Sequence, residues 1–183
     1  SSCDETGLAL IEAKHKDGRF FFSVKKNLVY SQIPTHRVHG GVVPEIAARE
    51  HAIRLPKLLL KLAADKKQIN NLKKAVDAIA VTSGPGLITS LLVGVEYAKI
   101  LSLVWQKPLI GLNHLEGHIY ANLLSASLPR QKTKNSTKRG SFSSEKKQFI
   151  FPVLCLIVSG AHTELVLMKN HLQYKILGST RDD

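Results

Sequence analysis

The sequence predicts an α/β protein in which strands and helices alternate after an opening group of strands. Three observations predict this class. Runs of β-branched and aromatic residues are bounded by turn residues. Two of those runs are followed by apolar residues at helical spacing. The pattern of the opening strands also returns after residue 148, which indicates a duplicated fold. We therefore expect a mixed sheet covered by helices on both faces.

The first 125 residues supply most of these elements. The predicted strands cover residues 6–14, 19–26 (after a turn at Asp17-Gly18), 27–33, 75–83 and 109–113. The predicted helices cover the stretch from Pro44 to 64, 87–105 and 114–125. Pro56 is expected to kink or interrupt the first helix, because proline cannot donate the helical hydrogen bond.

The apolar run 86–105 contains Glu96 and Lys99, which favours a buried helix over a membrane span. The first residues lack the pattern of a signal peptide. Cys3 and Cys155 are too few and too far apart for a disulfide framework or a zinc ribbon. We therefore expect a reducing compartment, the cytoplasm.

Residues 126–148 form a separate, basic stretch rich in Lys, Ser and Thr. Seven basic residues and one acidic residue there supply six of the twelve net positive charges of the chain. The composition predicts a flexible linker or insert. A net charge of +12 indicates either a polyanionic partner such as nucleic acid or a plainly solvated basic surface.

The last segment, 149–183, opens with predicted strands at 149–159, 162–169 and 172–178, as the first segment does. Both segments share a serine, a threonine four residues later, and leucines at plus six and plus eight. These residues are Ser2, Thr6, Leu8 and Leu10, and Ser159, Thr163, Leu165 and Leu167. We expect a first lobe at 1–125, the linker at 126–148 and an incomplete second lobe at 149–183, in a fragment of a longer protein.

Two histidines, His114 and His118, lie four residues apart in a predicted helix. That spacing places them about 40° apart on one helix face, where two imidazoles can share a divalent metal. The alternative is one core histidine and one surface histidine. Glu116 lies about 200° from His114, on the other face, so a metalloprotease base is not indicated.

Two turns carry weaker signals. Asp4 and Glu5 lie in the first hairpin turn, where they can position a metal-bound phosphate or a proton, or can simply be solvated. Residues 83–87, SGPGL, join a strand to a helix. Their amides can bind an anion at the positive helix end, although an ordinary turn fits equally well.

Five segments occur together in a known order: SSCDETGLAL, HGGVVPEIAAREH, VTSGPGLITSLLVGVEYAK, KPLIGLNHLEGHIYANLL and FPVLCLIVSGAHTELVLM. In this order they resemble the TsaD family, formerly the glycoprotease or O-sialoglycoprotein endopeptidase family. The resemblance implies the duplicated actin-like, Hsp70-like (ribonuclease H-like) ATPase fold, here as a first lobe and the start of a second. It also implies transfer of a threonylcarbamoyl group from threonylcarbamoyl-adenylate to N6 of the adenosine beside the anticodon in tRNAs reading ANN codons.

The resemblance also assigns site residues. One metal ion, iron or zinc, is expected on His114 and His118, with an aspartate that this chain does not contain as third ligand. Asp4 and Glu5 are expected in the nucleotide cleft, as catalytic residues. The expected substrate loop comprises Ile157, Val158, Ser159, Gly160 and Ala161. Implied partners are tRNA, a paralogous subunit and an ATPase.

Three features depart from the family pattern. The loop SGAH replaces SGGH, Ile100 replaces a small residue, and the second half is short. We therefore expect the 183-residue chain alone to be inactive and to bind metal poorly. The alternatives are a non-catalytic paralogue that acts as a scaffold and an actin-like protein that hydrolyses nucleotides. Such paralogues lack the histidine pair, so the pair favours the transferase.

Overall fold

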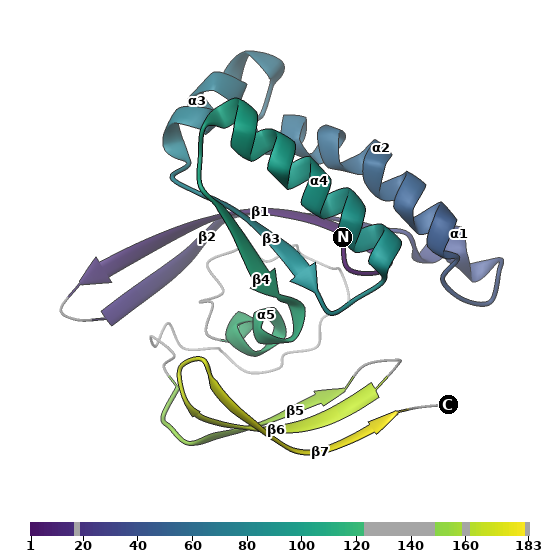
Figure 1. Cartoon of the computed structure of the whole chain (residues 1–183). Helices are drawn as coiled ribbons and strands as arrows, with labels where there is room; N and C mark the ends of the chain where they lie inside the picture. Colours follow the sequence, from purple (N-terminus) through teal and green to yellow (C-terminus); the bar gives the residue numbers. More distant parts are fainter. Residues whose placement is uncertain (17–18, 123–148, 159–161, 182–183) are drawn as a thin grey trace, which may run out of the picture. The chain divides into compact units, whose positions relative to one another are not determined.

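The computed structural model describes residues 1–16, 19–122, 149–158 and 162–181. These residues belong to two compact units, and the change from one to the other falls between His114 and Leu115. Unit 1 begins at Ser1, and unit 2 takes in the following helix together with the C-terminal strands (Figure 1). The predicted insert at 126–148 lies outside the described residues.

Unit 1 opens with a long antiparallel hairpin of β1 (Glu5–Lys16) and β2 (Arg19–Ser31). The strands pair from Glu5↔Ser31 to Lys16↔Arg19, with a shift of register after Leu10. The separate strand predicted over 27–33 is wrong, because residues 27–31 continue β2. No glycine or proline interrupts the chain there, so pairing with β1 carries on past the irregularity.

Helices follow the hairpin: α1 (Ile33–Arg37), α2 (Pro44–Leu62), the short 3₁₀ turn η1 (Lys66–Gln68) and α3 (Ile69–Ala75). Pro56 lies within α2, so the predicted interruption does not occur. A buried stripe that includes Leu55, Leu58 and Leu59 runs past the proline. Packing of that stripe keeps the helix continuous despite the missing hydrogen bond, since most helix stability in proteins comes from the packed face.

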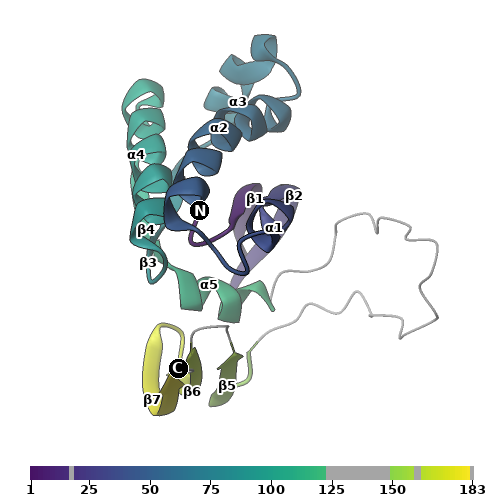
Figure 2. The ribbon, with the colours of Figure 1, turned by 90° about the vertical axis from the view of Figure 1, so that its right-hand side faces the viewer.

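The second part of unit 1 is a β–α–β arrangement of β3 (Ile79–Gly84), α4 (Ile88–Trp105) and β4 (Leu109–Asn113). β3 and β4 pair in parallel, as a strand–helix–strand crossover requires. The predicted single mixed sheet is not observed within the described residues, because β1–β2 and β3–β4 are separate two-stranded sheets. Figures 1 and 2 show α2 and α4 side by side, with the hairpin beside α2 and β3 beside α4.

The core of unit 1 gathers side chains from α2, α3 and the end of α4, on which the hairpin leucines pack. Its buried members are Leu59, Leu62, Ala63, Leu72 and Trp105. Small residues such as Gly94 and Ala98 lie on the buried side of α4. The opposite side exposes Leu92, Ile100 and Leu103, so the helix predicted to be buried is buried on one side only. Judged by length and composition only, α4 is also the one described helix that could cross a membrane.

Unit 2 consists of α5 (His114–Ala121), counted from Leu115, and an antiparallel sheet in the order β5 (Val153–Val158), β6 (His162–Asn170) and β7 (Gln173–Arg181). Ile119 of α5 packs with Ile157, Val166 and Met168 of the sheet. This contact places α5 with the C-terminal strands, whereas a boundary at 125 was expected. The helix ends at Ala121, and residues 123–125 lie outside the described part.

Candidate functional site

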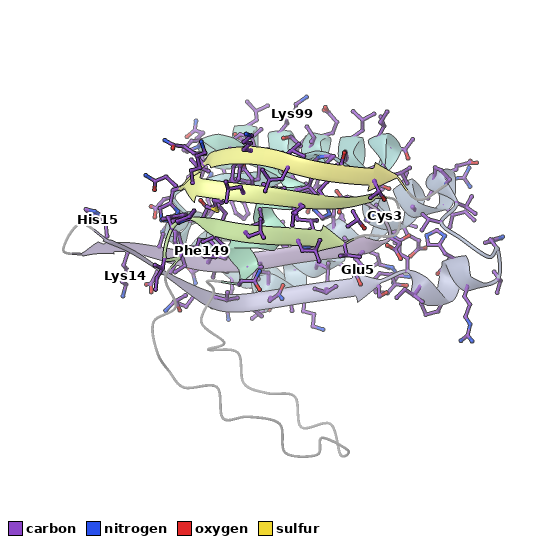
Figure 3. All side chains as sticks on the ribbon, turned by 90° about the horizontal axis from the view of Figure 1, so that it is seen from below. Cys3, Glu5, Lys14, His15, Lys99 and Phe149 are labelled. Carbon is purple, nitrogen blue, oxygen red and sulfur yellow. The ribbon has the colours of Figure 1, made fainter. Side chains whose placement is uncertain are left out.

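The first candidate region, here called the Cys3–Thr6 turn, consists of a bend at Cys3 and Asp4 and the first two residues of β1, Glu5 and Thr6. Glu5 was expected in a turn, but it pairs with Ser31 as the first residue of the strand. Figure 3 shows Cys3 and Glu5 at one end of the hairpin, with Lys14 and His15 at the other. Glu5 is exposed and Asp4 is half-buried. Cys3 is exposed, but partial burial of its thiol, followed by the negative charge of Asp4, raises its pKa above the ordinary value. Asp4 therefore lies close to this thiol, and the thiol stays protonated at neutral pH.

The main-chain carbonyls of three consecutive residues, Ser2, Cys3 and Asp4, accept hydrogen bonds from other parts of unit 1. The Leu87 amide donates to the Ser2 carbonyl at 2.8 Å, and the Gln32 amide donates to the Asp4 carbonyl at 2.9 Å. The Cys3 carbonyl accepts from His51 Nε2 at 2.8 Å and from Ser90 Oγ at 3.2 Å. The turn is thus held from α2, from the start of α4 and from the end of β2.

The SGPGL turn contributes to this attachment. A Cβ atom at Gly86 would lie 2.7 Å from the Ser2 carbonyl oxygen, so only glycine permits the close approach. The sequence left open whether these amides bind an anion. The Leu87 amide is already committed to Ser2, which gives this helix start a structural task that the sequence did not indicate.

Below the turn lies a buried polar network. Thr6 Oγ1 lies 2.7 Å from His51 Nδ1, and His36 Nε2 lies 2.9 Å from Gln32 Oε1. Gln32 Nε2 is 3.4 Å from both His51 Nδ1 and the Ala47 carbonyl. Burial lowers the pKa of His51, so its imidazole is neutral at pH 7.

Sequence analysis missed this network, although α2 carried a signal for it. His51 falls in the stripe Ala47, His51, Leu55 and Leu58, whose other members form the apolar, buried face of the helix. Buried polar side chains nearly always have hydrogen-bond partners. A histidine within an apolar stripe therefore indicates a partner elsewhere in the chain, although it does not say which one.

The second candidate region is α5, which carries His114 and His118. Leu115 and Ile119 face the sheet of unit 2. At about 100° per residue the two histidines lie about a quarter of a turn away from that face, on one flank of the helix. His118 is exposed and His114 is half-buried. The predicted helix is confirmed from His114 to Ala121, and both histidines lie on it four residues apart.

This donor pair fits a divalent transition metal in type and spacing, because imidazole suits iron and zinc and residues four apart are neighbours on a helix. The pair supplies two ligands, and a catalytic zinc site uses three. Within the described ranges, His, Cys, Asp and Glu side chains form no group of three or more that could hold a metal. His114 and His118 could therefore supply only part of a ligand set.

Glu116 lies elsewhere on the helix, as its spacing indicated. It is half-buried, and its negative charge contributes, after burial and the neighbouring Tyr120, to a raised pKa of Tyr174 on β7. Its carboxylate thus faces the sheet side of α5. This position agrees with the exclusion of a protease base next to the histidines.

The expected substrate loop is described only in part. Ile157 is buried in the core of unit 2, and Val158 is exposed at the end of β5. Ser159, Gly160 and Ala161 lie outside the described residues. The side chain of Ile157 thus packs under α5, which leaves its main chain as the part that can face a ligand.

Comparison with known proteins identifies the family. The family model for TsaD, tRNA N6-adenosine threonylcarbamoyltransferase, matches residues 23–132 and 137–183. Proteins of that name from Thermomicrobium roseum and Staphylococcus saprophyticus are 49% and 42% identical over 183 residues, which is 100% of this chain and 44% of each relative. The chain thus spans under half the length of these curated relatives.

Among solved structures, YeaZ from Pseudomonas aeruginosa is similar at 16% identity with a TM-score of 0.44, over 98% of this chain and 63% of that one. The family assignment does not depend on this similarity. The match of the family model over most of the chain, and the identities across all 183 residues, place this chain in the TsaD family of tRNA N6-adenosine threonylcarbamoyltransferases.

Proposed function

We propose that the protein containing this chain transfers the threonylcarbamoyl group of threonylcarbamoyl-adenylate to N6 of the adenosine beside the anticodon in tRNAs reading ANN codons. The observation that carries the proposal is 49% identity across the whole chain to a relative bearing that enzyme name. The histidine pair on one side of α5 supports it, because a scaffold protein has no need of two metal-ligating side chains there.

We assign the following parts to the chain. His114 and His118 would hold one iron or zinc ion, which when bound acts as a Lewis acid toward the acyl group. The main chain of the loop formed by Ile157, Val158, Ser159, Gly160 and Ala161 would bind the adenylate, with Asp4 and Glu5 near the nucleotide. The arrangement corresponds to the actin-like duplicated fold.

In the reaction, N6 of the adenine attacks the carbamoyl carbon and a new C–N bond forms. The bond from that carbon to the phosphate oxygen breaks, and AMP leaves with the electron pair. N6 then loses one proton to solvent or to a neighbouring base. Holding the acceptor and the acyl group together converts a bimolecular step into an effectively unimolecular one, which is the main contribution that binding residues make.

The partners follow from the substrates and the charge. A net charge of +12 favours contact with tRNA phosphates, and such binding weakens as salt rises. The basic insert at 126–148 is one candidate for that contact. We place the protein in the cytoplasm with its tRNA, together with a paralogous subunit and an ATPase.

The test combines the full gene product with purified partner subunits, threonylcarbamoyl-adenylate and a tRNA that reads ANN codons. We expect N6-threonylcarbamoyladenosine in the digested tRNA, measured by mass spectrometry. The isolated 183-residue chain should form none. ATP hydrolysis without tRNA, and without the modified nucleoside, would instead support an actin-like ATPase. If neither the modified nucleoside nor ATP hydrolysis is detected, the result would support a scaffold.

A further inference from the structure

We propose that His51 and Thr6 are positioning residues: they fix the Cys3–Thr6 turn so that Asp4 and Glu5 meet the substrate in a single orientation. The inference rests on the proposed function for the task of the turn, and on the structure for the way the turn is held. His51 reaches back from α2 to a carbonyl 48 residues earlier in the chain.

The hydrogen-bond partners determine the tautomer of His51. A carbonyl oxygen can only accept, so Nε2 of His51 must carry the proton that it donates to Cys3 at 2.8 Å. Nδ1 of the neutral ring is then an acceptor, and the Thr6 hydroxyl donates to it at 2.7 Å. One imidazole thus joins the carbonyl that precedes the two carboxylates to the side chain that follows them.

A second histidine orients the amide beside this pair. The Val43 amide donates to His36 Nδ1 at 3.3 Å, so His36 Nε2 carries the proton and donates to Gln32 Oε1 at 2.9 Å. The nitrogen of the Gln32 side chain therefore faces His51 Nδ1 at 3.4 Å. The main-chain amide of Gln32 also donates to the Asp4 carbonyl.

The side chains of the network are buried away from water, so each of them depends on its hydrogen-bond partners within the protein. Thr6, Gln32 and His51 are 0% exposed and His36 is 3% exposed. A buried donor or acceptor that loses its partner costs about 1–3 kcal/mol, so the network resists rearrangement. The side chains of Asp4 and Glu5 are more accessible than the network and are left for a ligand.

The network acts on the carboxylates only through the main chain. None of its hydrogen bonds goes to the carboxylate of Asp4 or Glu5. Thr6 itself stays paired with Tyr30 in the sheet, but loss of its hydroxyl would free the His51 ring that holds the Cys3 carbonyl. Loss of the imidazole would release that carbonyl directly. Either change should widen the range of carboxylate positions without removing a charge. An effect on the rate of transfer is expected because small misplacements of reacting groups are costly.

The experiment uses the full gene product and two independent readouts. Thr6→Val removes the hydroxyl and keeps the shape, whereas Thr6→Ser keeps the hydroxyl. His51→Gln keeps an N–H for the Cys3 carbonyl and removes the acceptor for Thr6. Leu72→Ala, in the core of unit 1, is the control for general loss of stability. All variants are compared below their unfolding temperatures.

The first readout is alkylation of Cys3 by iodoacetamide, followed by mass spectrometry of its peptide, with Cys155 in unit 2 as internal reference. Cys3 is exposed, so the reagent can reach it, and its raised pKa depends on partial burial of the thiol and on the position of Asp4. A released turn should therefore lower that pKa and speed alkylation about threefold to tenfold in Thr6→Val and His51→Gln. Thr6→Ser and Leu72→Ala should leave the ratio of Cys3 to Cys155 alkylation near that of the wild type.

The second readout is the transfer reaction. In Thr6→Val and His51→Gln, kcat should fall about tenfold to a hundredfold while KM for tRNA changes little. Thr6→Ser should restore kcat and Leu72→Ala should retain it. Unchanged Cys3 alkylation in both Thr6→Val and His51→Gln would show that the network does not hold the turn. Faster alkylation with an unchanged kcat would show that the turn has no part in transfer.

Both of those results overturn the proposal. If the wild-type protein forms no modified nucleoside, the proposed function fails and with it the task given to the carboxylates. The alkylation measurement still decides whether His51 and Thr6 hold the turn.

Discussion

The Cys3–Thr6 turn and the histidine helix α5 are positioned in different ways. Before β1 the turn is a bend at Cys3 and Asp4, and residues 28 to 87 positions away hold its carbonyls and its threonine. On α5, His114 and His118 share one side because residues four apart on any helix do so.

Because of this difference, substitutions in the two regions should have different effects. A change around the turn should alter the stability of unit 1 and the position of the carboxylates together. A change of an exposed histidine on α5 should alter only what the helix can bind. The predictions below test that separation.

The largest effect is expected from His118→Ala in the full gene product. Loss of one ligand should lower metal content and reduce transfer at least about a hundredfold, as weakening of metal sites does. Stability in the metal-free state should change by less than about 0.5 kcal/mol, because His118 is exposed. Metal analysis and thermal unfolding after chelation measure the two quantities.

His39→Ala is the matched control, since His39 is an exposed histidine of unit 1 in the loop after α1. It should leave both metal content and transfer unchanged. An equal loss of metal in His39→Ala, or full metal content in His118→Ala, would contradict the assignment of α5.

The next effect compares two glycines, one in each region. Gly86→Ala should destabilise the protein by about 1–3 kcal/mol, because the added methyl group meets the Ser2 carbonyl. Gly117→Ala on α5 should be neutral or should stabilise by up to about 1 kcal/mol, since alanine favours helix and nothing lies within 4 Å of the added atom. Urea unfolding measures both, and equal destabilisation would contradict the contrast.

The smallest effect concerns pH. The folded-state pKa of His51 lies below the ordinary value of 6.5, chiefly because of burial. The Cys3 carbonyl, Asp4 and Glu50 favour the charged ring and partly offset this shift, whereas the positive N-terminal amine adds to it. Below pH 6.5 the unfolded chain therefore binds a proton that the folded chain does not. Stability should fall toward acid pH between 6.5 and the folded pKa, by at most about 1.4 kcal/mol per pH unit.

Because other histidines also titrate, the measurement is a difference between wild type and His51→Gln. Urea unfolding at pH 7.5 and at pH 5.5 should give a smaller loss of stability in the variant. An identical loss in both proteins would mean that His51 takes up its proton as easily in the fold as outside it.

Much of the architecture follows from local patterns. The two long helices, the strand from Ile79, the short strand from Leu109 and the helix of the histidine pair all lie where spacing predicted them, within a few residues. β1 ends at Lys16 and β2 begins at Arg19, as the two predicted strands require, while the predicted turn residues between them lie outside the described part. These features depend on residues that are close together in the sequence, so local sequence patterns are enough to predict them.

Other features needed contacts between distant residues. Residues 27–31 continue β2 because β1 is there to pair with them, and Pro56 stays within α2 because one face of that helix is packed. Helix α5 belongs to unit 2 because Ile119 packs on the sheet.

The sequence alone determined the family, the helical spacing of His114 and His118, and the presence of two carboxylates at the first turn. Only the tertiary structure decided that His51 and Ser90 hold that turn and that Gly86 makes room for it. The physical reason is that hydrogen bonds between residues 48 and 87 positions apart produce no local pattern in the sequence from which they could be predicted.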